Sequence, residues 1–165
     1  TGSDGNTGLC SSYLKYFIHD LAECFGVNGR TVLSNSECLS ADVNAGFDPT
    51  YPEVADKNNF AFLNYGVVVT KFTGSRGKSG TSDASAEFVG KVHNLLRDNG
   101  IIFQTGELGK VDAGGGGTVA MYIANLDVNT IDVGVPVLCM HAPFEVVAKT
   151  DVYMAYKSFY VFMNE

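Results

Sequence analysis

The sequence has few basic residues relative to its acidic ones, and this shortage limits the classes of partner. Lysine and arginine number 11 against 18 aspartates and glutamates, which gives a formal net charge of −7 and a pI near 4.8. Nucleic-acid-binding proteins more often carry a basic surface, so we expect no nucleic-acid partner. An acidic surface suits a soluble enzyme but identifies no partner by itself.

Long apolar runs and closely paired cysteines are also missing. No stretch approaches the roughly 20 apolar residues of a membrane-spanning helix, and the first residues, TGSDGNTG, do not resemble a signal peptide. No CxxC pair occurs among the cysteines Cys10, Cys24, Cys38 and Cys139. We therefore expect no membrane partner, a cytoplasmic location and buried, reduced thiols. The chain begins with Thr1 rather than Met, so we expect a fragment or a processed product.

The residues that are present suffice for one globular domain over 1–165. Of the 165 residues, 45% are hydrophobic and 18% are charged, which is enough to bury a core. Apolar spacing predicts strands at 37–43, 66–72, 101–105 and 130–140. It predicts a first helix at 9–25 and a second that is capped by Asp83 and stopped by Asn99-Gly100. A third helix is predicted within 114–126, starting at the glycine run, and a fourth runs from a cap at Thr150 to Met163. Polar loops are expected at 44–64 and 73–83.

This alternation predicts an α/β fold whose mostly parallel sheet is covered on both faces. Sites in such sheets lie at the carboxyl ends of strands. Three polar segments occupy such positions: Ser40–Asp42, the loop 73–83 and Met140–Ala142.

Two glycine-rich segments partly match nucleotide-binding motifs. The segment TGSRGKSG contains Lys78-Ser79, but the phosphate-binding loop requires a glycine where Phe72 stands. Residues 115–120 match G-x-G-x-x-A, but the preceding GELGKVDA does not resemble a buried strand. A nucleotide-binding module is therefore a third-ranked hypothesis. Structural turns, or backbone N–H groups that bind an oxyanion or a carbonyl, remain open for these segments.

The few histidines leave one candidate metal ligand of this type. His19 and His93 lie on predicted helices and are expected to be structural or at the surface. His141 follows an apolar strand, and Asp42 ends another. An imidazole and a carboxylate are ligands that zinc accepts. For Asp42 taken alone, a helix or loop cap is the preferred interpretation.

Four longer segments resemble one family. They are LSADVNAGFDPTYPE, TKFTGSRGKSGTSDASAEF, QTGELGKVDAGGGGTVA and DVGVPVLCMHAPFEVVAKTDVYMAYKSF. By them the chain is identified as a member of the aminopeptidase I/aspartyl aminopeptidase family of dinuclear zinc metallopeptidases. The resemblance implies a three-layer zinc-exopeptidase fold, of which this chain supplies the carboxyl-terminal half. It also implies two Zn²⁺ ions per active site, peptide substrates and a homo-oligomer, possibly a dodecamer.

The resemblance also implies roles for individual residues. Asp42 matches the aspartate that binds one zinc, and His141 matches the histidine that binds the other. Glu145 is a possible supporting group, with a cap of the last helix as the alternative. The general-base glutamate and the other three of five protein ligands are expected upstream of Thr1.

Substrate contacts are implied in the same way. Besides Asp42, they involve Lys71, Lys78, Gly115 and Gly116. Aspartyl-specific members carry a histidine at the position of Ala45, and this departure leaves the residue specificity open. The implied function is removal of amino-terminal residues from peptides. The alternative is an inactive piece that acts as a structural or interaction subunit.

Overall fold

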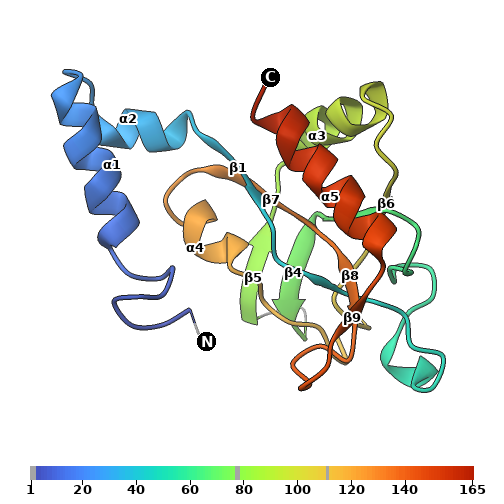
Figure 1. The fold of residues 1–165 in the computed structure, drawn as a ribbon. Helices are drawn as coiled ribbons and strands as arrows, with labels where there is room; N and C mark the ends of the chain where they lie inside the picture. The colour runs from blue at the N-terminus through green and yellow to red at the C-terminus, as the bar shows by residue number, and fades with distance from the viewer. Residues whose placement is uncertain (1–2, 77–78, 111) are drawn as a thin grey trace.

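The centre of the fold is a four-stranded sheet with the strand order β1-β7-β3-β6 (Figure 1). The computed structural model describes residues 3–76, 79–110 and 112–165. The strands are β1 (Glu37–Ser40), β7 (Asn129–Gly134), β3 (Val67–Thr70) and β6 (Phe103–Thr105). β1 is parallel to β7 and β3 is parallel to β6, whereas β7 and β3 are antiparallel. The expected α/β fold with a mostly parallel sheet is confirmed, with one antiparallel pair at its centre.

Helices α3 (Ala86–Asp98) and α5 (Lys149–Phe162) pack on one face of this sheet. The buried apolar residues of this core are Leu39, Val67, Val69, Ala84, Phe88, Val92, Leu96, Ile101, Ile131 and Val133. The strand members are largely β-branched, which suits a pleated, buried surface. Because side chains alternate along a strand, Asp132 of β7 faces the opposite side, where the segment before the short helix α4 (Ala120–Ala124) reaches it.

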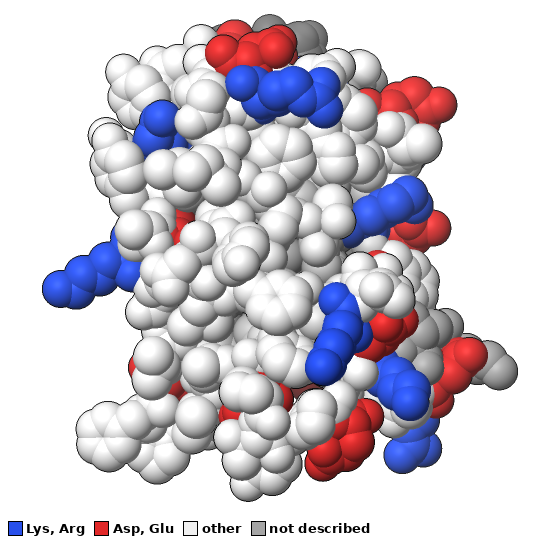
Figure 2. Space-filling view, turned by 90° about the vertical axis from the view of Figure 1, so that its right-hand side faces the viewer, with Lys and Arg blue, Asp and Glu red and all other residues white. Residues whose placement is uncertain are grey.

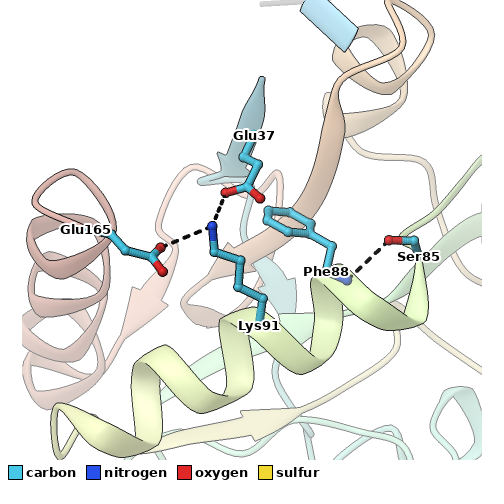
Figure 3. A network of polar contacts seen from close by, with 5 residues as sticks. All are labelled: Glu37, Ser85, Phe88, Lys91 and Glu165. Carbon is cyan, nitrogen blue, oxygen red and sulfur yellow. Dashed lines mark hydrogen bonds and ion pairs between the residues drawn. The ribbon is translucent and has the colours of Figure 1, made fainter. Parts of the chain in front are cut away.

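The caps of the two long helices differ from those expected. Ser85, not Asp83, caps α3, and its hydroxyl accepts a 3.2 Å hydrogen bond from the backbone N–H of Phe88 (Figure 3). Asp83 instead ends a strand and forms an ion pair with Lys71. Thr150 does not cap α5, because the helix begins at Lys149 and its cap residue is Ala148. The Thr150 hydroxyl instead donates to the Asn64 side chain at 3.1 Å.

A lysine on α3 joins the first strand of the sheet to the end of the chain (Figure 3). Lys91 Nζ lies 2.7 Å from a carboxylate oxygen of Glu37 and 3.4 Å from one of Glu165. All three side chains are partly exposed, so solvent screens both ion pairs. The contacts therefore connect β1, the middle of α3 and the last residue of the chain without contributing much to stability.

The predicted helix at 9–25 is shorter in the structure and is followed by a second helix. These are α1 (Tyr13–Cys24) and α2 (Gly29–Ser34), and Asn28 caps α2 by accepting from the N–H of Arg30 at 2.9 Å. The pair lies to one side of the sheet (Figure 1). Ala22 is the one buried residue of α1, whose exposed apolar side chains include Tyr13, Tyr16, Phe17 and Leu21.

The two expected loops, 44–64 and 73–83, contain strands, and one expected strand is divided. The predicted loop 73–83 is an antiparallel hairpin of β4 (Phe72–Ser75) and β5 (Ser79–Asp83). The predicted strand 130–140 divides at Val135 into β7 and β8 (Pro136–Leu138). β8 pairs with β2 (Asn44–Ala45) and with β9 (Val146–Val147). The only other described element between β2 and β3 is the short 3₁₀ helix η1 (Pro52–Val54).

The surface shows no single-sign patch on the face drawn in Figure 2, where a broad uncharged centre is bordered by charges of both signs. The net charge of −7 is therefore not gathered on this face.

Among the described residues, no helix has the length and apolar character needed to cross a membrane.

Candidate metal and substrate site

Asp42 lies just beyond β1, where the chain passes over Gly134 of β7. There is no room for a side chain at position 134, because an added Cβ would overlap the backbone of Asp42. The Asp42 carboxylate is partly exposed and accepts two backbone hydrogen bonds. Oδ1 accepts from the N–H of Val43 at 3.0 Å and Oδ2 from the N–H of Val119 at 3.1 Å.

A second carboxylate, Asp132, lies close to Asp42 and was not assigned to this site from the sequence. It is 3% exposed, and the hydroxyl of Thr118 donates to its Oδ2 at 2.7 Å. Burial raises the pKa of Asp132 to about 6, with the Ser40 and Thr118 hydroxyls acting in the lowering direction and the charge of Asp42 in the raising direction. A charged residue inside the apolar run TIDVGVPVL was the signal that could have indicated it.

The sheet places further polar groups beside Asp132. Ser40 of β1 and Thr70 of β3 are its register partners on either side. Asn44 Nδ2 donates to the Thr70 hydroxyl at 2.7 Å, in a buried contact that connects β2 to β3. Asn44 Oδ1 and Thr73 Oγ1 are buried and lack a hydrogen-bond partner among the described residues. Buried polar atoms without partners are uncommon, so this polar layer is a candidate site region.

His141 lies in the turn between β8 and β9 and is exposed. Its backbone is left-handed, with φ 66°, and its N–H donates to Glu145 Oε1 at 2.5 Å. Glu145 therefore supports the backbone of His141 rather than its ring, and it does not cap α5, whose cap residue is Ala148. Left-handed non-glycine residues cluster at functional sites, although turns contain them too.

Asp42 and His141 are not at the same end of the strands that connect them. β2 and β8 are parallel, with Asn44 opposite Pro136. Asp42 precedes β2, whereas His141 follows β8. Consistently, no group of three or more His, Cys, Asp or Glu side chains within the described ranges is placed to hold a metal ion.

Lys71 lies beside a small pocket of about 80 Å³. The pocket is lined by Asn59, Val69, Lys71, Val89, His93, Thr105, Gly106 and Glu107. Lys71 forms an ion pair with Asp83, and both side chains are about half exposed. Burial raises the pKa of Glu107, whereas Lys71 acts in the lowering direction. His93 is half-buried as expected, its ring packs against Phe103, and burial lowers its pKa.

The glycine run packs against the β4–β5 hairpin. The carbonyls of Gly114 and Gly116 accept hydrogen bonds from Arg76 and Gly74, at 2.7 Å and 2.9 Å. A Cβ on Gly115 would meet the backbone of Gly74, so close backbone approach is one reason for glycine there. Lys78, the other expected contact, lies outside the described residues. No strand precedes the run between Gly106 and Lys110 or at 112–113, so the nucleotide-binding motif lacks its required context.

The remaining expectations concern single residues. His19 is partly buried against Gly29 on α2, which fits the structural role expected for it. The expectation of buried thiols is wrong for Cys10, Cys24 and Cys139, which are exposed, whereas Cys38 is half-buried. No disulfide forms among them.

The Asp42 carboxylate meets part of what a metal ligand requires. Each oxygen accepts one hydrogen bond and retains a lone pair for a cation. The recorded ion pairs of the described residues do not involve Asp42 or Asp132. The sheet and its helices, with a polar layer beside Asp42, define the class as α/β proteins.

The comparisons with known proteins identify the family. The model of the "Aminopeptidase I zinc metalloprotease (M18)" family matches residues 1–163, so the chain belongs to the M18 family. It is 44% identical over 167 residues to "Probable M18 family aminopeptidase 1" of Clostridium acetobutylicum, covering 99% of this chain and 36% of that protein. The chain thus spans little more than a third of the length of that relative.

Solved structures agree in fold. The M18 aminopeptidase of Thermotoga maritima matches with a TM-score of 0.92 and 40% identity, over 98% of this chain and 37% of that one. The structure described as the mApe1 dodecamer of S. cerevisiae matches with a TM-score of 0.79 and 26% identity, over 99% of this chain and 35% of that one. The zinc-exopeptidase fold expected from the resemblance is confirmed as the fold of M18 aminopeptidases, of which this chain covers a part.

Proposed function

We propose that this chain forms part of a two-zinc aminopeptidase that removes amino-terminal residues from peptides. The observation that carries the proposal is the Asp42 carboxylate, held by two backbone N–H groups beside the buried Asp132. In this proposal Asp42 binds one zinc ion and His141 binds the other. When bound, zinc lowers the pKa of a coordinated water and stabilises the developing oxyanion.

The residues of this chain then hold the metal and the substrate. Asp42 supplies a carboxylate whose direction is fixed by Val43 and Val119. Lys71, on the rim of the pocket, supplies a cation for substrate binding, and Lys78 is a second candidate. Gly115 and Gly116 present backbone to the substrate. We place the general base and the remaining ligands outside residues 1–165.

The wider assembly and the location in the cell are also proposals. A relative is described as a dodecamer, and we propose a homo-oligomer for the complete protein. The same proposal includes residues 1–165 as the carboxyl-terminal part of a single catalytic domain, and the cytoplasmic location. It assigns no acidic specificity, because Ala45 departs from the aspartyl-specific pattern.

One observation favours a second candidate function for residues 1–165 alone. The described part of the chain contains no cluster of three metal-binding side chains. In this alternative, residues 1–165 alone form an inactive structural or interaction subunit.

Metal content distinguishes the two functions. The protein is purified at its full natural length, and intact mass and bound zinc are measured together. The aminopeptidase predicts about two zinc ions per chain and release of amino-terminal residues from peptides. Asp42→Asn and His141→Ala should each lower the zinc content, whereas Asp56→Asn and His19→Ala, the matched controls, should not. A natural chain whose mass matches residues 1–165, and which has no zinc and no activity, would support the inactive subunit and contradict the enzyme.

A further inference from the structure

Asp42 depends for its orientation on a residue from a distant part of the chain. Val119, which donates to Asp42 Oδ2, is 77 residues away in sequence. Its neighbour Thr118 is 6% exposed and donates its hydroxyl to Asp132 Oδ2 at 2.7 Å. Two consecutive residues therefore connect two carboxylates, one partly exposed and one buried.

Asp132 is a rigid point from which such a contact can be built. It lies inside β7, with Ser40 of β1 opposite it on one side and Thr70 of β3 on the other. A residue paired with both neighbouring strands cannot shift without disturbing the sheet. The hydroxyl of Thr118 is therefore attached to a strand that is paired on both sides.

The segment that carries Val119 has few other fixed points. The glycine run is attached to β4 as far as the carbonyl of Gly116. Helix α4 begins only at Ala120 and has five residues. Between these two points, the carbonyls of Thr118 and Val119 accept from the N–H groups of Met121 and Tyr122 in the first turn of α4. The Thr118 hydroxyl is the side-chain group of this segment recorded as attaching it to the sheet.

We propose that Thr118 is a positioning residue for Asp42. Its hydroxyl, anchored on Asp132, holds the Val119 N–H against Asp42 Oδ2 and thereby directs the other lone pairs of the carboxylate toward the cation. This role rests on the proposed function of Asp42 as a zinc ligand. Groups that orient metal ligands through hydrogen bonds typically contribute 10- to 100-fold in metal affinity.

The first test removes only the hydroxyl. In the protein at its full natural length, Thr118→Val keeps the shape of the side chain, whereas Thr118→Ser keeps its donor. Zinc affinity is measured by competition with a chelator, and hydrogen exchange of residues 114–122 is measured on the metal-free protein. We expect Thr118→Val to bind zinc about 10- to 100-fold more weakly and to exchange faster, and Thr118→Ser to resemble the wild type.

A second pair of variants removes the Val119 N–H directly, in case Thr118→Val fails to fold. The φ of Val119 is −65°, which proline adopts, so Val119→Pro deletes the donor without changing that angle. Val119→Ala keeps the donor and is the control. We expect Val119→Pro to lose zinc affinity to a similar degree while Val119→Ala retains it.

The outcomes separate the two proposals. If Asp42→Ala abolishes zinc binding while folded Thr118→Val or Val119→Pro binds zinc like its control, the positioning role is overturned and the metal site stands. Equal losses in Thr118→Val and Thr118→Ser would also overturn it. If the wild type binds no zinc, or Asp42→Ala binds zinc normally, the proposed function is wrong and the positioning role is wrong with it.

Discussion

Asp151 in the first turn of α5 accepts a 2.9 Å hydrogen bond from the backbone N–H of Gly66, just before β3. Its other oxygen accepts from the N–H of Asn64 at 2.7 Å, and the side chain is fully buried. One carboxylate therefore satisfies two backbone donors and attaches α5 to the sheet.

Replacing Asp151 should destabilise the fold strongly. Asp151→Ala leaves two backbone N–H groups without a partner, each at a cost of about 1–3 kcal/mol. We expect a fall of roughly 3 kcal/mol in the free energy of unfolding, measured by urea denaturation. Lys149→Ala, on the same turn but without such a contact, is the control. A loss under about 1 kcal/mol would mean that water replaces the carboxylate.

The sequence predicted α3 well but not its neighbouring hairpin, and the reason is physical. Phe88, Val92 and Leu96 recur at helical spacing, and Asn99-Gly100 provides a stop, which the structure confirms with a φ of 61° at Gly100. The β4–β5 hairpin has no apolar alternation, because its strands face polar surroundings and glycine backbone. Local pattern carries little information about such strands.

The candidate site was predictable where the signal lay in a local string and not where it lay in tertiary contacts. Asp42 and His141 are predicted from the sequence because each follows a strand, and the family resemblance strengthens both predictions. Nothing near Asp132 in the sequence indicates that Thr118 bonds to it or that Ser40 lies opposite. The division of the predicted strand 130–140 at Val135 cannot be predicted from the sequence, because the apolar run continues across it.

The buried carboxylate of Asp132 should make stability depend on pH. Its folded pKa of about 6 lies above the ordinary value of 3.8, so the folded state binds more protons between these values. The free energy of unfolding should therefore fall as pH rises through this range, by up to about 3 kcal/mol. The destabilisation caused by the buried charge is absent below pH 3.8 and complete well above pH 6.

Asp132→Asn should remove this dependence. Melting of metal-free protein at pH 4 to 7 should show the variant gaining stability relative to the wild type as the pH rises. Asp127→Asn, an exposed position, is the matched comparison. Parallel wild-type and Asp132→Asn profiles would contradict a raised pKa for Asp132.

Lys71 should affect substrate binding rather than the fold. Its ion pair with Asp83 is half exposed and contributes at most about 1 kcal/mol to stability. If its cation contacts the peptide, Lys71→Met should raise KM on the order of tenfold, the equivalent of about 1.4 kcal/mol, with less change in kcat. Steady-state kinetics of Lys71→Met, with Lys91→Met as the control on α3, measures this. A wild-type KM in Lys71→Met would remove Lys71 from the substrate site.

Neighbouring glycines offer a test of why the run 114–117 is glycine. Gly115 has a φ of 92°, and a Cβ there would overlap the carbonyl of Gly74, whereas a Cβ on Gly116 would meet nothing within 4 Å. Gly115→Ala should therefore cost about 1–3 kcal/mol, and Gly116→Ala should be nearly neutral in denaturant melts. Because the run precedes Thr118, Gly115→Ala should also speed hydrogen exchange at 114–122. Equal stabilities of the two variants would mean that the run can move off the β4–β5 hairpin at little cost, and close backbone approach would then not explain its composition.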